Sequence, residues 1–386
     1  MQSIAKTDRE VAAWLRLTMA PGLKPAALRM LLNHFGLPDA VLDQPFESLA
    51  LVTGEASARA ILGTPGADFA MQLDAVLAWR DTPGNTLLTL DDPAYPPMLL
   101  TMSDPPPLLY VKGCLAPLHA CSVAVVGSRN ATPQGAEDAQ RFSRVFSEAG
   151  VVVVSGLALG IDAAAHRGAL AGRAGTIAVV GTGADIVYPS THHGLARDIA
   201  ATGAILSEWP LGTPARPAHF PQRNRLIAGL VNGVLIVEAA MRSGSLITAR
   251  LANEMGRDVF ALPGSIHAPL SRGCHRMIKQ GAKLIETPED VLEELGAPAL
   301  PPSDKTVIAG TQLPLLSQND AAPGALPPDA QRLLDALGHA PATLEILAAR
   351  TEMDTTALQG ALLQLELSGH LTALHGGRYV RAGHRR

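Results

Sequence analysis

Residues 151–166 read VVVVSGLALGIDAAAH: four consecutive valines, a turn rich in glycine and serine, and then a stretch of small helix-forming residues. Five further short apolar runs occur along the chain, at 123–126, 177–180, 204–206, 234–237 and 259–262. Strands that are apolar along their whole length are typical of a parallel sheet covered on both faces. The segments 133–149 and 245–256 are long enough for crossover helices. The sequence therefore predicts a doubly wound α/β domain over residues 116–295.

Two regions with different patterns precede this domain. Apolar residues at helical spacing over residues 1–80, interrupted by the turn APGLKP at 20–25, indicate a small helical module of the SAM or helix-hairpin-helix type. Such a module serves either for packing alone or, through the amides of its turn, for holding a phosphate. The proline-rich residues 81–115 are expected to form an ordered connector.

Two further regions follow the α/β domain. Residues 296–328 contain seven prolines and little periodicity, which predicts a flexible linker. Residues 329–386 have the order of a winged helix, with three helical segments followed by a glycine-containing hairpin. The third helix, at 354–368, carries no lysine or arginine, so we expect no sequence-specific duplex binding from it.

The composition excludes several classes of protein. Apolar residues make up 47% of the 386, which excludes a disordered chain. No run of about eighteen apolar residues occurs, and the first ten residues lack the apolar segment of a signal peptide. Three cysteines without a CxxC pair fit neither a disulfide framework nor a zinc site. We therefore expect a soluble cytoplasmic protein that contacts no membrane and binds no metal.

Polar and glycine-rich turns follow the predicted strands. In a doubly wound sheet, ligands bind beyond the carboxyl ends of the strands, where these turns converge. Glycine and serine there let backbone amides and hydroxyls approach an anion. Glu238 and Asp162, in the same region, could act as acid and base or could orient nearby backbone and arginines. The turns predict a phosphate-binding rim made of Gly127, Ser128, Arg129, Ser155, Gly156, Gly160, Ser243, Gly244 and Ser245.

The motifs of common cofactor and catalytic sites are missing from the chain. The turn at 127–129 is not GxGxxG, so a dinucleotide is unsupported, and no GxxxxGK[ST] stretch marks a P-loop. Neither GxSxG nor HExxH occurs. We expect no cofactor and assign no catalytic residue.

Positive charge is concentrated between residues 216 and 283. This segment, called the basic segment below, holds ten lysines and arginines against three acids, a balance of +7 in a chain of formal net charge −4. Eight of the ten are arginine, which suits bidentate contacts to phosphate. Phe220 lies in the same segment, within HFPQRNR at 219–225. It is either a core anchor or an aromatic surface on which a base stacks.

Together these motifs closely resemble the DNA-processing protein A family (DprA, also called Smf). The resemblance covers residues 116–295 with high specificity, and the two flanking modules fit the family's layout. It implies an extended Rossmann fold that binds single-stranded DNA, and it implies no enzymatic activity. The stretches that carry it are GSR at 127–129, SGLALGIDAAAH at 155–166, GTGADIVYP at 181–189, FPQRNRLIAGL at 220–230, VEAAMRSGSLITAR at 237–250 and VFALPG at 259–264.

The resemblance also implies a role in natural transformation, in which the protein protects incoming single strands and helps to load a RecA-type recombinase. Carried over by motif, Arg129, Arg223 and Arg225 would hold phosphate, Phe220 would contact a base, and the turn at 243–245 would accept the DNA backbone. Asn224 and Arg250, in the same motifs, complete the predicted DNA site.

One motif departs from the family pattern, which commonly has Ser-x-Gly-x-Asn-x-Leu-Ile after the last core strand. Residues 271–278 read SRGCHRMI, so His275 stands at the asparagine position and the contact made there is open. The family usually forms dimers, and a two-fold contact would place two DNA grooves in register. We expect that contact at the neighbouring apolar residues Met277, Ile278, Leu284 and Ile285; the alternative is that these residues pack under the sheet.

Two other functions compete with a single-strand-binding mediator. The first is a nucleotide-processing hydrolase of the phosphoribohydrolase type, whose usual signature is PGGxGTxxE. The corresponding turn at 242–248 reads RSGSLIT and lacks the glutamate, which argues against hydrolysis. The second is a transcription regulator that binds duplex DNA through the winged helix.

Overall fold

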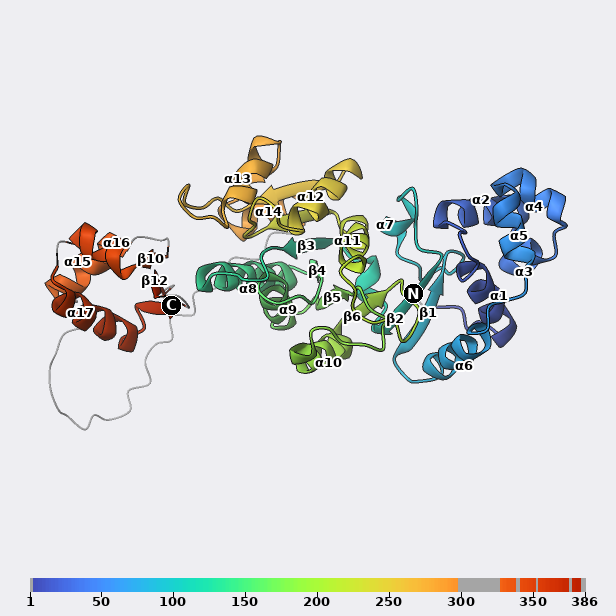
Figure 1. The fold of residues 1–386 in the computed structure, drawn as a ribbon, viewed down its shortest axis with the longest axis horizontal. Helices are drawn as coiled ribbons and strands as arrows, with labels where there is room; N and C mark the ends of the chain where they lie inside the picture. The colour runs from blue at the N-terminus through green and yellow to red at the C-terminus, as the bar shows by residue number, and fades with distance from the viewer. Residues whose placement is uncertain (1–2, 298–326, 338–340, 352, 375–376, 383–386) are drawn as a thin grey trace.

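A computed structural model of the chain describes residues 3–297, 327–337, 341–351, 353–374 and 377–382. Its centre is a nine-stranded sheet in the order β1-β2-β6-β5-β4-β3-β7-β8-β9 (Figure 1). Neighbouring strands from β6 to β9 pair in parallel, as a doubly wound sheet requires, so that prediction is confirmed. The strands are β1 Asn85–Thr89, β2 Leu108–Gly113, β3 Ser122–Val126, β4 Val152–Ser155, β5 Thr176–Val179, β6 Ala204–Ser207, β7 Gly233–Ile236, β8 Asp258–Ala261 and β9 Lys283–Leu284.

Helices cover both faces of this sheet. Because successive strand residues point to opposite faces, Val123 and Val125 pack under the first helix layer and Ala124 and Val126 under the second. The first layer is α8 (Pro133–Glu148), α9 (Ile161–Leu170), α10 (His193–Thr202) and α14 (Pro288–Glu294). The second is α7 (Pro97–Leu100), α11 (His219–Leu230), α12 (Ser245–Glu254) and α13 (Arg272–Lys279).

Residues 81–115, expected to be a connector, instead contribute two strands of the sheet. β1 pairs antiparallel with β2, and β2 pairs antiparallel with β6. Leu88, Leu109 and Val111 are fully buried in the same core as the central strands. The apolar runs of these strands are short and lie between prolines, so the sequence pattern alone resembles irregular structure.

The N-terminal module is helical, as expected, and its described residues form six helices. The first starts at a capping box in which the Thr7 hydroxyl accepts from the Glu10 amide, and the Glu10 carboxylate accepts from the Thr7 amide. Arg29 donates to the carbonyl oxygen of Met102 at 2.9 Å, which fixes the module to the α/β domain. The helices are α1 Asp8–Thr18, α2 Pro25–Phe35, α3 Pro38–Leu42, α4 Phe46–Thr53, α5 Glu55–Leu62 and α6 Phe69–Arg80.

The C-terminal module has the predicted winged-helix order. Its three helices pack around buried leucines such as Leu333, Leu358 and Leu365, next to a three-stranded antiparallel sheet. The elements are α15 Pro328–Leu337, β10 Ala342–Thr343, α16 Leu344–Thr351, α17 Thr355–Leu367, β11 Leu371–Leu374 and β12 Arg378–Arg381. The linker predicted for 296–328 lies almost entirely outside the described residues. Among the described residues, no helix is long and apolar enough to span a bilayer.

Candidate nucleic-acid interface

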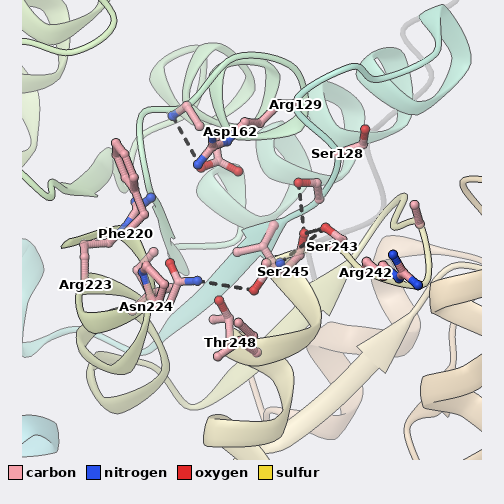
Figure 2. A pocket seen from close by; sticks show the side chains of 18 of the residues that line it. Ser128, Arg129, Asp162, Phe220, Arg223, Asn224, Arg242, Ser243, Ser245 and Thr248 are labelled. Atoms are coloured by element: carbon pink, nitrogen blue, oxygen red, sulfur yellow. Dashed lines mark hydrogen bonds between the residues drawn. The ribbon is translucent and has the colours of Figure 1, made fainter. Parts of the chain in front are cut away.

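A cavity of about 600 Å³ opens at the carboxyl edge of the sheet. It lies where the strand order reverses, because β3 has β4 on one side and β7 on the other. The turn after β3, the start of α9, the helix α11 and the turn before α12 surround it (Figure 2). Nine predicted site residues line this cavity: Gly127, Ser128, Arg129, Phe220, Arg223, Asn224, Ser243, Gly244 and Ser245.

The turn after β3 is held in one conformation by its neighbours. The amide of Ser128 donates to the carbonyl oxygen of Glu238 at 2.7 Å, and the Ser128 hydroxyl accepts from the Asn130 amide at 3.1 Å. A Cβ atom at Gly127 would lie 2.5 Å from the Ile161 side chain and 2.8 Å from the Glu238 carbonyl oxygen. Glycine is therefore required at 127, and the exposed side chain of Arg129 is presented at the rim.

The serine turn before α12 is tied to the elements on both sides of the cavity. The hydroxyls of Ser243 and Ser245 lie 2.6 Å apart, and the Ser245 hydroxyl donates to the carbonyl oxygen of Gly127 at 3.0 Å. On the other side, the Asn224 side-chain amide donates to the carbonyl oxygen of Gly244 at 3.2 Å. The rim is thus preorganised, with hydroxyls and the first turn of a helix facing the cavity (Figure 2).

An aromatic surface forms one side of the cavity. Phe220 is half-buried, and the Arg129 guanidinium carbon lies 5.1 Å from the centre of its ring. The Tyr188 ring lies 5.8 Å from the Phe220 ring, is tilted by 38° and is 49% exposed. Tyr188 was not among the residues predicted from the motifs, although the stretch GTGADIVYP at 181–189 contains it. Two adjacent rings with an arginine provide stacking and a positive charge at the same place.

Arg223 lines the cavity but is only 4% exposed. Its guanidinium donates to the carbonyl oxygen of Val179 at 2.8 Å and lies directly against the backbone of Gly156, where any Cβ would overlap it. Burial lowers its pKa to about 10, although the charge of Asp162 opposes that change. The structure therefore places Arg223 in the cavity floor, as part of the fold, rather than on the rim where phosphate was expected.

Asp162 is the opposite charge that faces this buried arginine. Its carboxylate accepts from the amides of Gly156 at 3.1 Å and Ala158 at 3.4 Å. Burial raises its pKa, and the charge of Arg223 and these hydrogen bonds oppose the rise. Glu238 likewise accepts from the Thr132 amide at 2.9 Å and the Thr132 hydroxyl at 2.6 Å. Both carboxylates orient backbone, the second of the two roles considered from the sequence.

Five predicted site residues do not line the cavity. Ser155 is buried and donates to the carbonyl oxygen of Val125, while Gly156 and Gly160 provide close backbone packing behind the rim. Arg225 forms an ion pair with Glu208 and donates to the carbonyl oxygen of Asp104 at 2.8 Å. Arg250 is exposed on α12, outside the lining. The helical turn that brings Arg223 into the cavity floor thus directs Arg225 to another surface.

Some residues of the predicted dimer surface are buried in the structure. Met277 and Ile285 are only 5% and 2% exposed and pack in the two layers of the core, so they are unavailable for a contact between protomers. Leu284 on the edge strand β9 is 50% exposed and remains available.

At the position that departs from the family pattern, Nε2 of His275 lies 3.0 Å from the carbonyl oxygen of Gly264. His275 therefore secures the turn after β8.

The sequences and structures of other proteins agree with this architecture. Residues 86–296 match the family described as DNA recombination-mediator protein A. The chain belongs to this family. Residues 317–377 additionally match its winged-helix domain, described as DprA winged helix domain. The doubly wound fold, the C-terminal winged helix and the family resemblance drawn from the motifs are thereby confirmed, and the chain is a DNA-processing recombination mediator.

Three relatives illustrate the extent of the similarity. The protein Smf of Escherichia coli is 41% identical over 312 residues, which cover 80% of each chain. The X-ray structure of DNA processing protein A from Streptococcus pneumoniae has a TM-score of 0.64 at 38% identity and covers 75% of this chain and 99% of that one. A DNA processing protein A from Helicobacter pylori, described by its single-stranded DNA binding mode, has a TM-score of 0.50 at 31% identity and covers 55% and 95%.

Across the described residues, no three His, Cys, Asp or Glu side chains are grouped so as to hold a metal ion. The chemistry that the cavity offers is instead hydrogen bonding, positive charge and aromatic stacking. Arg129 and Arg242 provide positive charge at the rim. The hydroxyls belong to Ser128, Ser243 and Ser245, and the aromatic rings belong to Tyr188 and Phe220.

Proposed function

We propose that this chain is a cytoplasmic recombination mediator that binds single-stranded DNA in the cavity at the carboxyl edge of its sheet. The observation that carries the proposal is the pairing of the half-buried Phe220 ring and the exposed Tyr188 ring with exposed arginines around one preorganised cavity. Bases of a single strand stack on Phe220 and Tyr188, while Arg129 and Arg242 contact its phosphates. Duplex DNA keeps its bases stacked on each other, so it gains nothing from the aromatic surface.

The relative from Helicobacter pylori supports this assignment, because its structure is described by its single-stranded DNA binding mode. We further propose that the bound strand is passed to a RecA-type recombinase during natural transformation, and that the protein acts as a dimer through the edge that contains Leu284. Leu284 is an exposed apolar residue on the terminal strand of the sheet.

Fluorescence anisotropy with labelled single-stranded and duplex oligonucleotides, at two salt concentrations, tests the proposal. Unaltered protein should bind the single strand more tightly. Arg129→Ala should weaken that binding for every sequence and reduce the salt slope by about 0.7, the contribution of one phosphate contact on a single strand. Arg144→Ala is the matched control, since Arg144 is 56% exposed on α8, outside the cavity lining. Equal affinity for duplex, or an unchanged slope for Arg129→Ala, contradicts the proposal.

We propose binding without catalysis, against the hydrolase alternative. Glu238 and Asp162 are both engaged with backbone amides, which supports an orienting role for each. Incubation with nucleoside monophosphates and with labelled oligonucleotide, followed by chromatography, tests this point. Release of free base or of shortened strands, lost in Glu238→Gln, would establish the hydrolase instead.

A further inference from the structure

The ten cations of the basic segment divide into two groups. Four are engaged within the fold: Arg223 and Arg225 as described, Arg257 with the carbonyl oxygen of Met98 and the hydroxyl of Thr101, and Lys283 with Asp258 and Glu294. The other six form no side-chain hydrogen bond or ion pair with any described residue; they are Arg216, Arg242, Arg250, Arg272, Arg276 and Lys279. The second group is the positive charge available to a ligand.

Three of these six cations share one face of a single helix. Arg272, Arg276 and Lys279 occupy positions i, i+4 and i+7 of α13, so their side chains project from the same side. Arg272 and Lys279 are exposed and Arg276 is half-buried. The opposite side of α13 is anchored by Gly273, Cys274 and Met277, all buried against the sheet. We call the three cations the α13 basic face.

This face starts at the rim of the cavity. The amide of Gly273, in the first turn of α13, donates to the carbonyl oxygen of Ala239 at 2.8 Å. The next residue, Ala240, lines the cavity, as does Arg242. A Cβ atom at Gly273 would lie 2.4 Å from the Ala239 carbonyl oxygen, so glycine permits this close approach. The turn after β7 therefore brings the first turn of α13, which carries Arg272, next to the cavity rim.

The chemistry of the face fits a polyanion that leaves the cavity. Three cations lie on one side of an eight-residue helix of about 12 Å, so a strand that follows the helix brings several phosphates within their reach. No acidic side chain occurs between residues 259 and 285, so nothing along α13 itself neutralises them. The acids Asp258 and Glu294 are engaged with Lys283, just beyond the helix.

We propose that the α13 basic face is a second DNA subsite, which holds the phosphates of the same single strand where it leaves the cavity past Arg242. The inference rests on the proposed function and extends it, because it assigns the segment of DNA outside the cavity to α13. It predicts that affinity and salt dependence both increase with the length of the strand.

The test compares a dinucleotide with a longer strand of about twenty nucleotides of oligothymidylate. A cavity of about 600 Å³ cannot enclose a six-nucleotide strand, and the longer strand exceeds the roughly 4–16 nucleotides that a single OB-fold site covers. The triple variant Arg272→Gln, Arg276→Gln and Lys279→Gln removes the face. At about 0.7 per phosphate, its salt slope for the long strand should fall by about 2. A fourfold rise in salt should therefore weaken the unaltered protein roughly 20-fold more than the variant. Binding of the short strand should be unchanged.

The control variant removes the same number of charges from the other helix layer, by Arg141→Gln, Arg144→Gln and Arg167→Gln, and should bind both strands normally. If the triple variant does not fold, the single changes Arg272→Gln and Lys279→Gln at exposed positions should each lower the slope by about 0.7.

Equal salt slopes for the triple variant and the unaltered protein on the long strand refute the subsite while the cavity assignment stands. Failure of the unaltered protein to bind either strand refutes the proposed function itself. Loss of dimers, with DNA affinity unchanged, would assign the face to a contact between protomers and overturn the inference.

Discussion

Replacement of Arg223 by alanine should unfold the central domain more easily rather than remove a DNA contact. The side chain is 4% exposed, donates to the Val179 carbonyl oxygen and faces the buried carboxylate of Asp162. Removing one partner of a buried charge pair leaves the other uncompensated, at a cost of about 3–5 kcal/mol. For a domain of this size each kcal/mol lowers the melting temperature by about 2–4 °C, so a decrease on the order of 10 °C is expected.

Thermal unfolding followed by circular dichroism measures this effect, with DNA binding measured well below the transition. The double variant Arg223→Met with Asp162→Asn removes both charges and should recover about 1–3 kcal/mol of the loss. Arg129→Ala, at an exposed position, should change stability by less than about 0.5 kcal/mol while weakening DNA binding. An Arg223→Ala protein with the unaltered melting temperature but without DNA affinity would refute the structural role and restore the phosphate contact predicted from the motif.

Four other predictions address the aromatic surface, the dimer edge, the pH response and the C-terminal module. Phe220→Ala should weaken single-strand binding by about 1–3 kcal/mol with an unchanged melting temperature; a large decrease in that temperature would make Phe220 a core anchor. Leu284→Glu should give monomers in light scattering, whereas Met277→Glu should destabilise the fold because Met277 is 5% exposed; dimers that persist in Leu284→Glu would exclude this edge. Burial raises the pKa of Glu208 from 4.5 to about 7 against the effect of Arg225, so the folded state holds a proton that the unfolded state releases. The free energy of unfolding should therefore decrease as pH rises from 4.5 to 7. In urea titrations, Glu208→Gln should show a smaller decrease over this range, and a pH dependence equal to that of the unaltered protein would contradict the prediction. A chain truncated after residue 297 should retain single-strand affinity within about tenfold, or about 1.4 kcal/mol, and a larger loss would place the winged helix in the DNA site.

The sequence by itself determined the elements with a strong local signal. Continuous valine runs such as 151–154 predicted buried parallel strands, and the turns that follow them predicted the edge at which ligands bind. This works because the apolar pattern and the glycine turns are local consequences of a sheet covered on both faces. The strands β1 and β2 were missed because prolines interrupt their surroundings and because the pairing of β2 with β6 joins residues far apart in the chain.

Only the tertiary structure decided which side chains of one motif reach the ligand. Within FPQRNR, the helix α11 turns Phe220 toward the cavity, Arg223 into its floor and Arg225 toward Glu208. From the sequence alone, Arg223 and Arg225 are equivalent candidates for a phosphate contact. Whether an arginine is buried and has a carboxylate partner depends on residues from other segments of the chain, such as Asp162 and Val179 for Arg223. Tyr188 joined the site for the same reason, since its distance to Phe220 is set by how the strands pack and not by their order in the sequence.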